Sequence, residues 1–263
     1  SKVLSLPLAP DRRREKREHL APAARRPPGR TAARTTKPAE RVRGRMNIFR
    51  FLGDMAHIVS FILLLHKIVR GKSAAGISLR TQEMYAVVFA ARYVDLLWNF
   101  SSLYNYVLKL LFIGASAAIV YFMRFGAPQK ATYNAEEDTF PVQYLLAPCA
   151  VLGVLINQDH TSPFEMIWAF SIYLEAVAIL PQLFLLQKQG EVENLTSHYV
   201  FALGSYRALY LLNWIYRYFT EDDYQQRIVW ISGIVQTALY CDFFYHYYQS
   251  KKSGLNQSVK LPV

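Results

Sequence analysis

The chain has 263 residues, of which 52% are hydrophobic, and it carries a formal net charge of +11. Residues 1–45 contain 14 Lys and Arg against 4 Asp and Glu, so a net charge of only +1 belongs to residues 46–263. The basic character is therefore local, and we expect no nucleic-acid partner for the rest of the chain. The sequence lacks a Gly-rich phosphate loop, a Gly-x-Ser-x-Gly elbow and a His-Glu-x-x-His motif, and its two cysteines form no metal-ligand pattern, which argues against an enzyme.

Residues 1–45 are rich in arginine and contain six of the twelve prolines. Such a segment has too little apolar surface to build a core, so we expect a disordered basic extension. It could be a tail for nucleic acid or anionic lipid, but it lacks the apolar stretch of a signal peptide and ends abruptly at Met46. We expect it to lie outside the mature fold, which would begin at Met46.

From Met46 onward the sequence predicts an all-α integral membrane protein. Seven apolar stretches are each near the ~20 residues that a helix needs to cross a bilayer. They cover about 47–69, 79–98, 102–123, 141–157, 164–187, 199–219 and 227–249. Together they predict a seven-helix receptor domain over residues 46–250 and a tail over residues 251–263.

The loops differ in charge. Lys and Arg gather in or beside the odd-numbered loops and the tail, whereas the even-numbered loops carry mainly acidic residues, among them Asp159 and Glu221. The positive-inside rule then places the C-terminus in the cytosol and Met46 on the lumenal side. The basic residues upstream of Met46 would violate this rule, which again separates them from the fold.

Charged residues interrupt the apolar stretches. A charge near the bilayer centre costs roughly 2.5–3.5 kcal/mol even on the lenient insertion scale, so these side chains must face the interior of the bundle. They are Arg50, Asp54, Arg92, Asp95, Glu165, Glu175, Arg207, Arg217 and Asp242, with His57 beside them.

Helical spacing and the predicted topology group these residues by face and depth. Arg50, Arg92, Arg217 and Glu165 are expected near the lumenal ends of four helices, and His57, Glu175 and Tyr206 about two turns deeper. Three guanidiniums and one carboxylate at one mouth suit a ligand with three negative groups and one positive group. The alternative is that acids and bases, which nearly balance, form internal ion pairs that only lock the bundle.

Several motifs resemble the KDEL receptor family over residues 46–250. They are Met46-Asn-Ile-Phe-Arg50, Ala75-Gly-Ile-Ser78, Arg92-Tyr93-x-Asp95-Leu96, Ser171-Ile-Tyr-Leu-Glu175, Ile179-Leu-Pro-Gln-Leu-Phe184, Tyr206-Arg-Ala-Leu-Tyr210 with Asn213-Trp214, and Tyr240-Cys-Asp-Phe-Phe244. The resemblance implies a fold similar to SWEET and PQ-loop transporters, with two three-helix repeats around a linking helix (a 3+1+3 arrangement). It also implies a receptor that binds the C-terminal Lys/His-Asp-Glu-Leu signal of escaped endoplasmic reticulum proteins in the acidic Golgi, and returns them.

By this resemblance, the ligand-binding residues would be Arg50, Arg92, Tyr93, Asp95, Glu165, Trp168, Tyr210, Asn213, Trp214 and Arg217. Arg92 and Tyr93 would hold the terminal carboxylate, and Arg50 and Arg217 the two acidic side chains. Glu165 and Trp168 would hold the cationic residue through charge and a cation–π contact. Asp95 would pair with Arg50, and Tyr210 and Asn213 would contact the ligand backbone.

A pH switch is expected at His57, with Glu175 and Tyr206, because only an imidazole has an unperturbed pKa, ~6.5, between the pH values of the two compartments. A lone buried histidine can also be an ordinary core residue. Lys251 and Lys252 would be a retrieval signal for the coat of retrograde vesicles, or only the positive flank of the last span.

The resemblance therefore implies a multi-pass protein that cycles between Golgi and endoplasmic reticulum and has protons as its only effector, with no cofactor and no metal. Its partners would be tail peptides of lumenal proteins, the vesicle coat and membrane lipid. The main alternative is a proton-coupled solute transporter of the SWEET or PQ-loop type. The charges argue against it, because they crowd toward the lumen while the cytosolic halves of the helices look mostly apolar.

Overall fold

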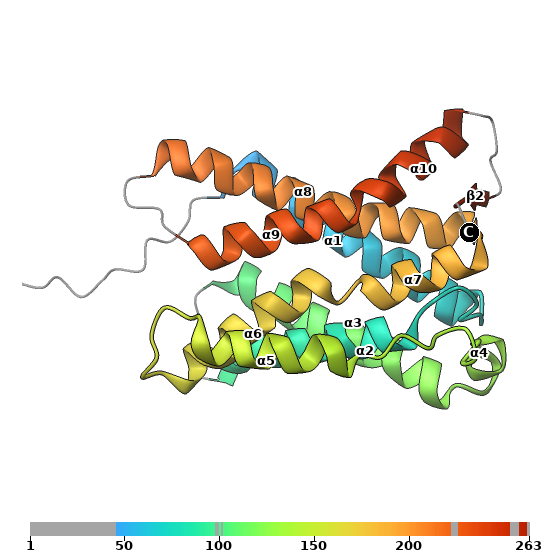
Figure 1. The fold of residues 1–263 in the computed structure, drawn as a ribbon, viewed down its shortest axis with the longest axis horizontal. Helices are drawn as coiled ribbons and strands as arrows, with labels where there is room; N and C mark the ends of the chain where they lie inside the picture. Colours follow the sequence, from blue (N-terminus) through green and yellow to red (C-terminus); the bar gives the residue numbers. More distant parts are fainter. Residues whose placement is uncertain (1–45, 98–99, 101, 222–225, 253–257, 262–263) are drawn as a thin grey trace, which may run out of the picture. The chain divides into compact units, whose positions relative to one another are not determined.

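The computed structural model describes residues 46–97, 100, 102–221, 226–252 and 258–261. The extension predicted for residues 1–45 lies outside the described residues. The described part is mostly helical (Figure 1). Its elements are α1 (Ile48–Leu65), the π-helical turn η1 (His66–Arg70), α2 (Leu79–Arg92), the 3-10 turn η2 (Val94–Leu97), α3 (Leu103–Phe125), α4 (Ala127–Thr132), α5 (Gln143–Leu155), α6 (Pro163–Val177), α7 (Leu180–Gln189), β1 (Glu191–Glu193), α8 (Asn194–Thr220), α9 (Arg227–Leu239), α10 (Cys241–Lys252) and β2 (Ser258–Lys260).

Short polar side chains start four of the helices. The side chains of Asn47, Ser78, Ser102 and Ser162 each accept a hydrogen bond from the backbone N–H three residues further on. This contact satisfies one of the N–H groups that the first turn of a helix leaves without a partner. The chain therefore enters α1, α2, α3 and α6 at defined residues.

Two of the predicted spans are broken helices. The fifth is divided into α6 and α7 just before Pro181, which has no backbone N–H to continue the helix. The seventh is divided into α9 and α10 at Tyr240, whose side chain is fully buried. Next to the first break, the side chain of Gln182 accepts from the backbone N–H of Ser78 at 2.9 Å and donates to the carbonyl of Gly76 at 2.8 Å.

Four helical stretches are long and apolar enough to cross a membrane: Ile48–Arg70, Leu103–Phe125, Pro163–Gln189 and Arg227–Lys252. Gln143–Leu155 is apolar but shorter. Large apolar side chains such as Ile62, Leu110 and Val154 are exposed on the outside of these helices, as lipid contact requires. These features are those of an all-α membrane protein, while the count of seven spans and the 3+1+3 arrangement stay predictions.

The helices pack around a single large core. α1 lies along α8, α2 packs against α3 and α6, α5 packs against α6, and both α6 and α8 contact α9. Figure 1 shows α6 and α7 passing between a group formed by α1, α8, α9 and α10 and a group formed by α2, α3 and α5. Helix α6 therefore touches both groups, and polar residues on it can reach partners in either.

A small antiparallel sheet joins two distant parts of the chain at one end of the bundle. β1 pairs with β2 in the register Glu191 to Lys260, Val192 to Val259 and Glu193 to Ser258. Val192 and Val259 are both 1% exposed and belong to the main core. The segment that follows α10 is thus attached to the strand that precedes α8.

Candidate ligand-binding site

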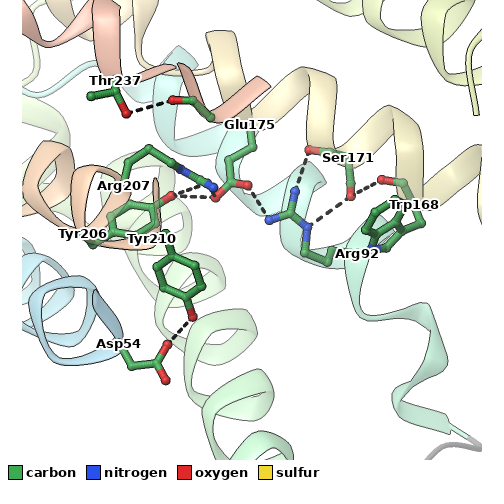
Figure 2. Close-up of polar contacts among 10 residues, drawn as sticks. Asp54, Arg92, Trp168, Ser171, Glu175, Tyr206, Arg207, Tyr210 and Thr237 are labelled. Atoms are coloured by element: carbon green, nitrogen blue, oxygen red, sulfur yellow. Dashed lines mark hydrogen bonds and ion pairs between the residues drawn. The ribbon is translucent and has the colours of Figure 1, made fainter. Parts of the chain in front are cut away.

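Glu175 is the centre of the most heavily charged cluster inside the bundle (Figure 2). It lies on α6 and is 3% exposed, and its two carboxylate oxygens form ion pairs with Arg92 of α2 and Arg207 of α8. Tyr206 donates a hydrogen bond to the same carboxylate at 2.6 Å, and Arg207 donates to the Tyr206 hydroxyl at 2.9 Å. Three helices therefore meet at one buried carboxylate. The ion pairs and the hydrogen bond compensate for the removal of its charge from water.

Arg92 is held on α6 by more than its ion pair. Its Nε donates to the Ser171 hydroxyl at 3.2 Å, and a terminal nitrogen donates to the Ser171 carbonyl at 2.9 Å. The Ser171 hydroxyl in turn donates to the carbonyl of Trp168 at 2.6 Å. The guanidinium is thus oriented by one helical turn of α6, as Figure 2 shows.

His57 lies next to this cluster and is buried among aromatic rings. Its imidazole stacks on the Tyr206 ring, with centroids 4.0 Å apart and an interplanar angle of 6°, and on Phe112 at 4.4 Å. A proton on His57 would thus sit against the ring whose hydroxyl binds Glu175. The structure brings together the three residues of the predicted pH switch, and their role in pH sensing stays a prediction.

Asp54 is a second buried carboxylate, and its described partners are phenols. Tyr104 donates to one oxygen at 2.8 Å and Tyr210 donates to the other. This links α1 to α3 and α8. About two turns before Asp54, the Asn47 amide donates to the side-chain oxygen of Asn213 at 2.6 Å.

Helix α3 also contacts three of the predicted ligand residues. A guanidinium nitrogen of Arg50 donates to the side-chain oxygen of Asn105 at 3.0 Å. Lys109 bonds both oxygens of Asp95 at 2.8 Å and lies 5.6 Å from the centre of the Tyr93 ring. The ion pair that the structure describes for Asp95 is thus with Lys109, and its predicted pairing with Arg50 stays a prediction.

The remaining predicted ligand residues lie on α6 and α8. Arg217 pairs with Glu221 one turn later at 2.7 Å. Within the described residues, the Oε1 atom of Glu165 is buried and has no hydrogen-bond partner. Trp168 packs against the small apolar cluster that contains Trp214. Glu165 and Trp168 are three residues apart on one face of α6, and a buried carboxylate oxygen without a partner on the same face as an indole is a suitable place for a cation.

The predicted mouth of three guanidiniums is arranged differently in detail. We expected Glu175 about two turns below Arg92, but the two side chains form an ion pair. Arg207 was recognised only as a charge within a span, although it is the second partner of Glu175. Lys109, Tyr104 and Asn105 were missed altogether. The signal for them was the presence of polar side chains in the third apolar stretch, with Asn105 and Lys109 one turn apart.

A helical bundle with apolar residues on its outside and ion-paired residues inside defines an integral membrane protein with a polar site between its helices. The family model for the ER lumen protein retaining receptor matches residues 73–217. An ER lumen protein-retaining receptor A from Arabidopsis thaliana is 56% identical over 218 residues, which are 83% of this chain and 100% of the relative. Over the same coverage, receptor erd-2.2 of Caenorhabditis elegans is 54% identical and receptor 3 of Mus musculus is 50% identical.

The chain therefore belongs to the ER lumen protein-retaining receptor family, as its sequence motifs predicted. This is a family of retention receptors and not of enzymes, and it does not favour the solute transporter that we considered as the alternative.

Proposed function

We propose that this protein is the receptor that captures escaped lumenal proteins through a C-terminal Lys/His-Asp-Glu-Leu signal in the acidic Golgi. It returns them by coat-dependent retrograde transport and releases them at the near-neutral pH of the endoplasmic reticulum. The protein cycles between the two compartments, with Met46 on the lumenal side and the C-terminus in the cytosol. The observation that carries the proposal is the convergence of Arg92, Glu175 and Arg207 inside a member of this receptor family.

The proposed ligand step is an exchange of carboxylates on Arg92. The side chain of Arg92 is 16% exposed and that of Arg207 is 8% exposed, so Arg92 is the more accessible partner of Glu175. A peptide carboxylate of similar geometry can take the place of Glu175 on the guanidinium, because Glu175 keeps Arg207 as its counterion. In this proposal Arg50 and Arg217 bind the acidic side chains, Glu165 and Trp168 bind the cation, and Tyr93, Asp95, Tyr210, Asn213 and Trp214 shape the site.

The proposed proton step acts on the same carboxylate. The His57 ring lies against Tyr206, which donates to Glu175. A positive charge on His57 would change the balance of charges around Glu175 and favour its separation from Arg92, which frees that guanidinium for the ligand. Acidic pH then favours peptide binding, and protons are the only effector that the proposal needs.

The proposed output is the tail. Lys251 donates to the side-chain oxygen of Asn194 at 2.9 Å, and β2 is paired with β1, so the tail is attached to the start of α8. Ligand binding would release it and free Lys251, which is half-buried, next to Lys252, which is already exposed, so that the vesicle coat can bind both. Replacing both lysines by alanine should leave peptide affinity unchanged and abolish retrograde return of the receptor, measured by its distribution between the two compartments. Normal recycling of the double variant would contradict this assignment.

The central experiment is a binding titration of the purified protein with tail peptides that end in a free acid or in an amide. Each peptide is titrated at a mildly acidic pH and at a near-neutral pH. We expect tight binding only for the free acid at the lower pH, since the amide cannot form a bidentate ion pair with Arg92. Equal affinity for the two peptides would overturn the carboxylate exchange, and equal affinity at the two pH values would overturn the proton step.

A further inference from the structure

Lys67 is a buried cation that the proposed receptor mechanism does not use. It lies in η1, directly after α1, and is only 3% exposed. Its ammonium donates to a carboxylate oxygen of Glu193 at 2.5 Å and to the hydroxyl of Thr196 at 2.6 Å. Lysine is almost never buried unless it is paired, and π-helical turns often mark functional positions, so this residue needs an explanation.

The partners of Lys67 stand at the start of α8. Glu193 is the residue before α8 and the last residue of β1, and Thr196 lies in the first turn of α8. The start of a helix carries a partial positive charge, which repels an ammonium. The Glu193 carboxylate makes no hydrogen bond to the first turn of α8, and its ion pair with Lys67 offsets the repulsion of the ammonium by the helix start.

The tail is attached at this same place. Glu193 faces Ser258 in the register of β1 and β2, the N–H of Leu261 donates to the carbonyl of Gly190 at 2.9 Å, and Lys251 donates to Asn194. Two strands of three residues each are too short to stay paired by themselves. The docking of β2 therefore requires that the rest of the structure hold β1 in place.

We propose that Lys67 is a positioning residue that holds β1 in the orientation that docks the tail, and that it connects the tail to α1. Helix α1 also carries Asp54 and His57, and ten residues of helix separate His57 from Lys67, about 15 Å. A shift of α1 at the ligand-binding site is thus carried by a rigid helix to Lys67, and through Glu193 to β1. This inference rests on the proposed function, because release of the tail matters only if the tail recruits the vesicle coat.

The test measures how accessible the tail strand is. Val259 is 1% exposed only because β2 is docked, so a cysteine at that position reports undocking by its rate of maleimide labelling. The full chain carries Val259→Cys together with Cys149→Ala and Cys241→Ser, which remove the two native thiols. In this background we compare Lys67→Gln, Glu193→Gln and the matched control Lys67→Arg, each without peptide.

We expect labelling to become on the order of tenfold faster in Lys67→Gln and in Glu193→Gln, with a rate close to the parent in Lys67→Arg, which keeps the charge. Peptide binding at acidic pH should be retained, with an affinity equal to or tighter than that of the parent, because a ligand that releases the tail binds better where the tail is already released. Retained binding separates loss of tail docking from loss of fold. The Glu193 side chain is 60% exposed, so its variant tests the contact even where Lys67→Gln fails to fold.

Unchanged labelling in Glu193→Gln would overturn the inference, as would equally fast labelling in Lys67→Arg and Lys67→Gln. The comparison uses no peptide, so it stands or fails separately from the proposed function. A parent protein that binds no tail peptide would reject the receptor mechanism and leave the role of Lys67 in tail docking to be decided by the labelling rates.

Discussion

Two of the buried carboxylates, Glu175 and Asp54, are stabilised in different ways. Glu175 has two guanidinium partners and one phenol, whereas the described partners of Asp54 are the two phenols of Tyr104 and Tyr210. A guanidinium that pairs with a carboxylate can exchange that partner for the carboxylate of a ligand. A neutral phenol that donates a hydrogen bond mainly fixes the position of its acceptor. The difference supports the proposal that Glu175 is the site of switching, whereas the hydrogen bonds of Asp54 link α1, α3 and α8.

The largest effect is expected from Glu175→Gln. Removing this charge leaves the guanidiniums of Arg92 and Arg207 buried near each other, and breaking a buried ion pair costs about 3–5 kcal/mol. The melting temperature in detergent should fall strongly, measured by the reactivity of the buried thiol of Cys149 during heating. Asp242→Asn is the matched control, because its side chain is 60% exposed. Equal melting temperatures for the two variants would contradict the central role of Glu175.

A smaller loss of stability is expected from Asp54→Asn. The amide keeps one oxygen that accepts from a phenol, so one charged hydrogen-bond acceptor is lost, which costs about 1–3 kcal/mol. The same thermal assay should rank this variant between Glu175→Gln and Asp242→Asn. A loss as large as that of Glu175→Gln would show that the two carboxylates do not differ as we describe.

The His57→Phe variant sharpens the comparison at the level of pH. Phenylalanine keeps the stacking on Tyr206 and Phe112 but cannot take up a proton. If peptide binding requires one proton on His57, affinity falls by up to about tenfold for each unit of rising pH above the histidine pKa. The variant should lose this slope in a binding titration, and a wild-type slope in it would remove His57 from the mechanism.

The smallest effect is expected at the exposed ion pair between Arg124 and Glu83. Their side chains are 54% and 32% exposed, and such pairs contribute about 0–1 kcal/mol. Arg124→Ala should leave both the melting temperature and peptide affinity close to wild type. A large change in melting temperature or affinity would mean that burial does not distinguish the ion pairs of Glu175 from ion pairs on the surface.

The sequence predicts the helices better than their contacts. Each of the seven apolar stretches contains an α-helix, although the α-helix of the second ends at Arg92, because hydropathy is a local property. The breaks before Pro181 and at Tyr240 were not predicted, since a short interruption leaves the apolar pattern intact. A buried glutamine must form hydrogen bonds, but the partners of Gln182 near Ser78 are distant in sequence, so the sequence could not identify them.

The residues of the candidate site were found by their charge, but their pairing was not. Helical periodicity gives the face and the approximate height of a side chain. An arginine is long enough to reach a partner about one turn, 5.4 Å, away from its own level, so height alone could not assign Arg92 to Glu175. Lys109 was missed because a single cation in a strongly apolar stretch looks like a lipid-facing exception.

Gly53 lies where α1 meets α8. A Cβ atom there would lie 2.7 Å from the Tyr210 ring, closer than two carbons can approach. The phenol that binds Asp54 thus occupies space that exists only because residue 53 has no side chain. Any larger amino acid would displace the Tyr210 ring rather than the backbone of α8, because the carbonyl oxygen of Tyr206 would still be 3.5 Å from that Cβ atom. The hydrogen bond that this receptor makes between α8 and the Asp54 carboxylate thus depends on the smallest possible residue at position 53.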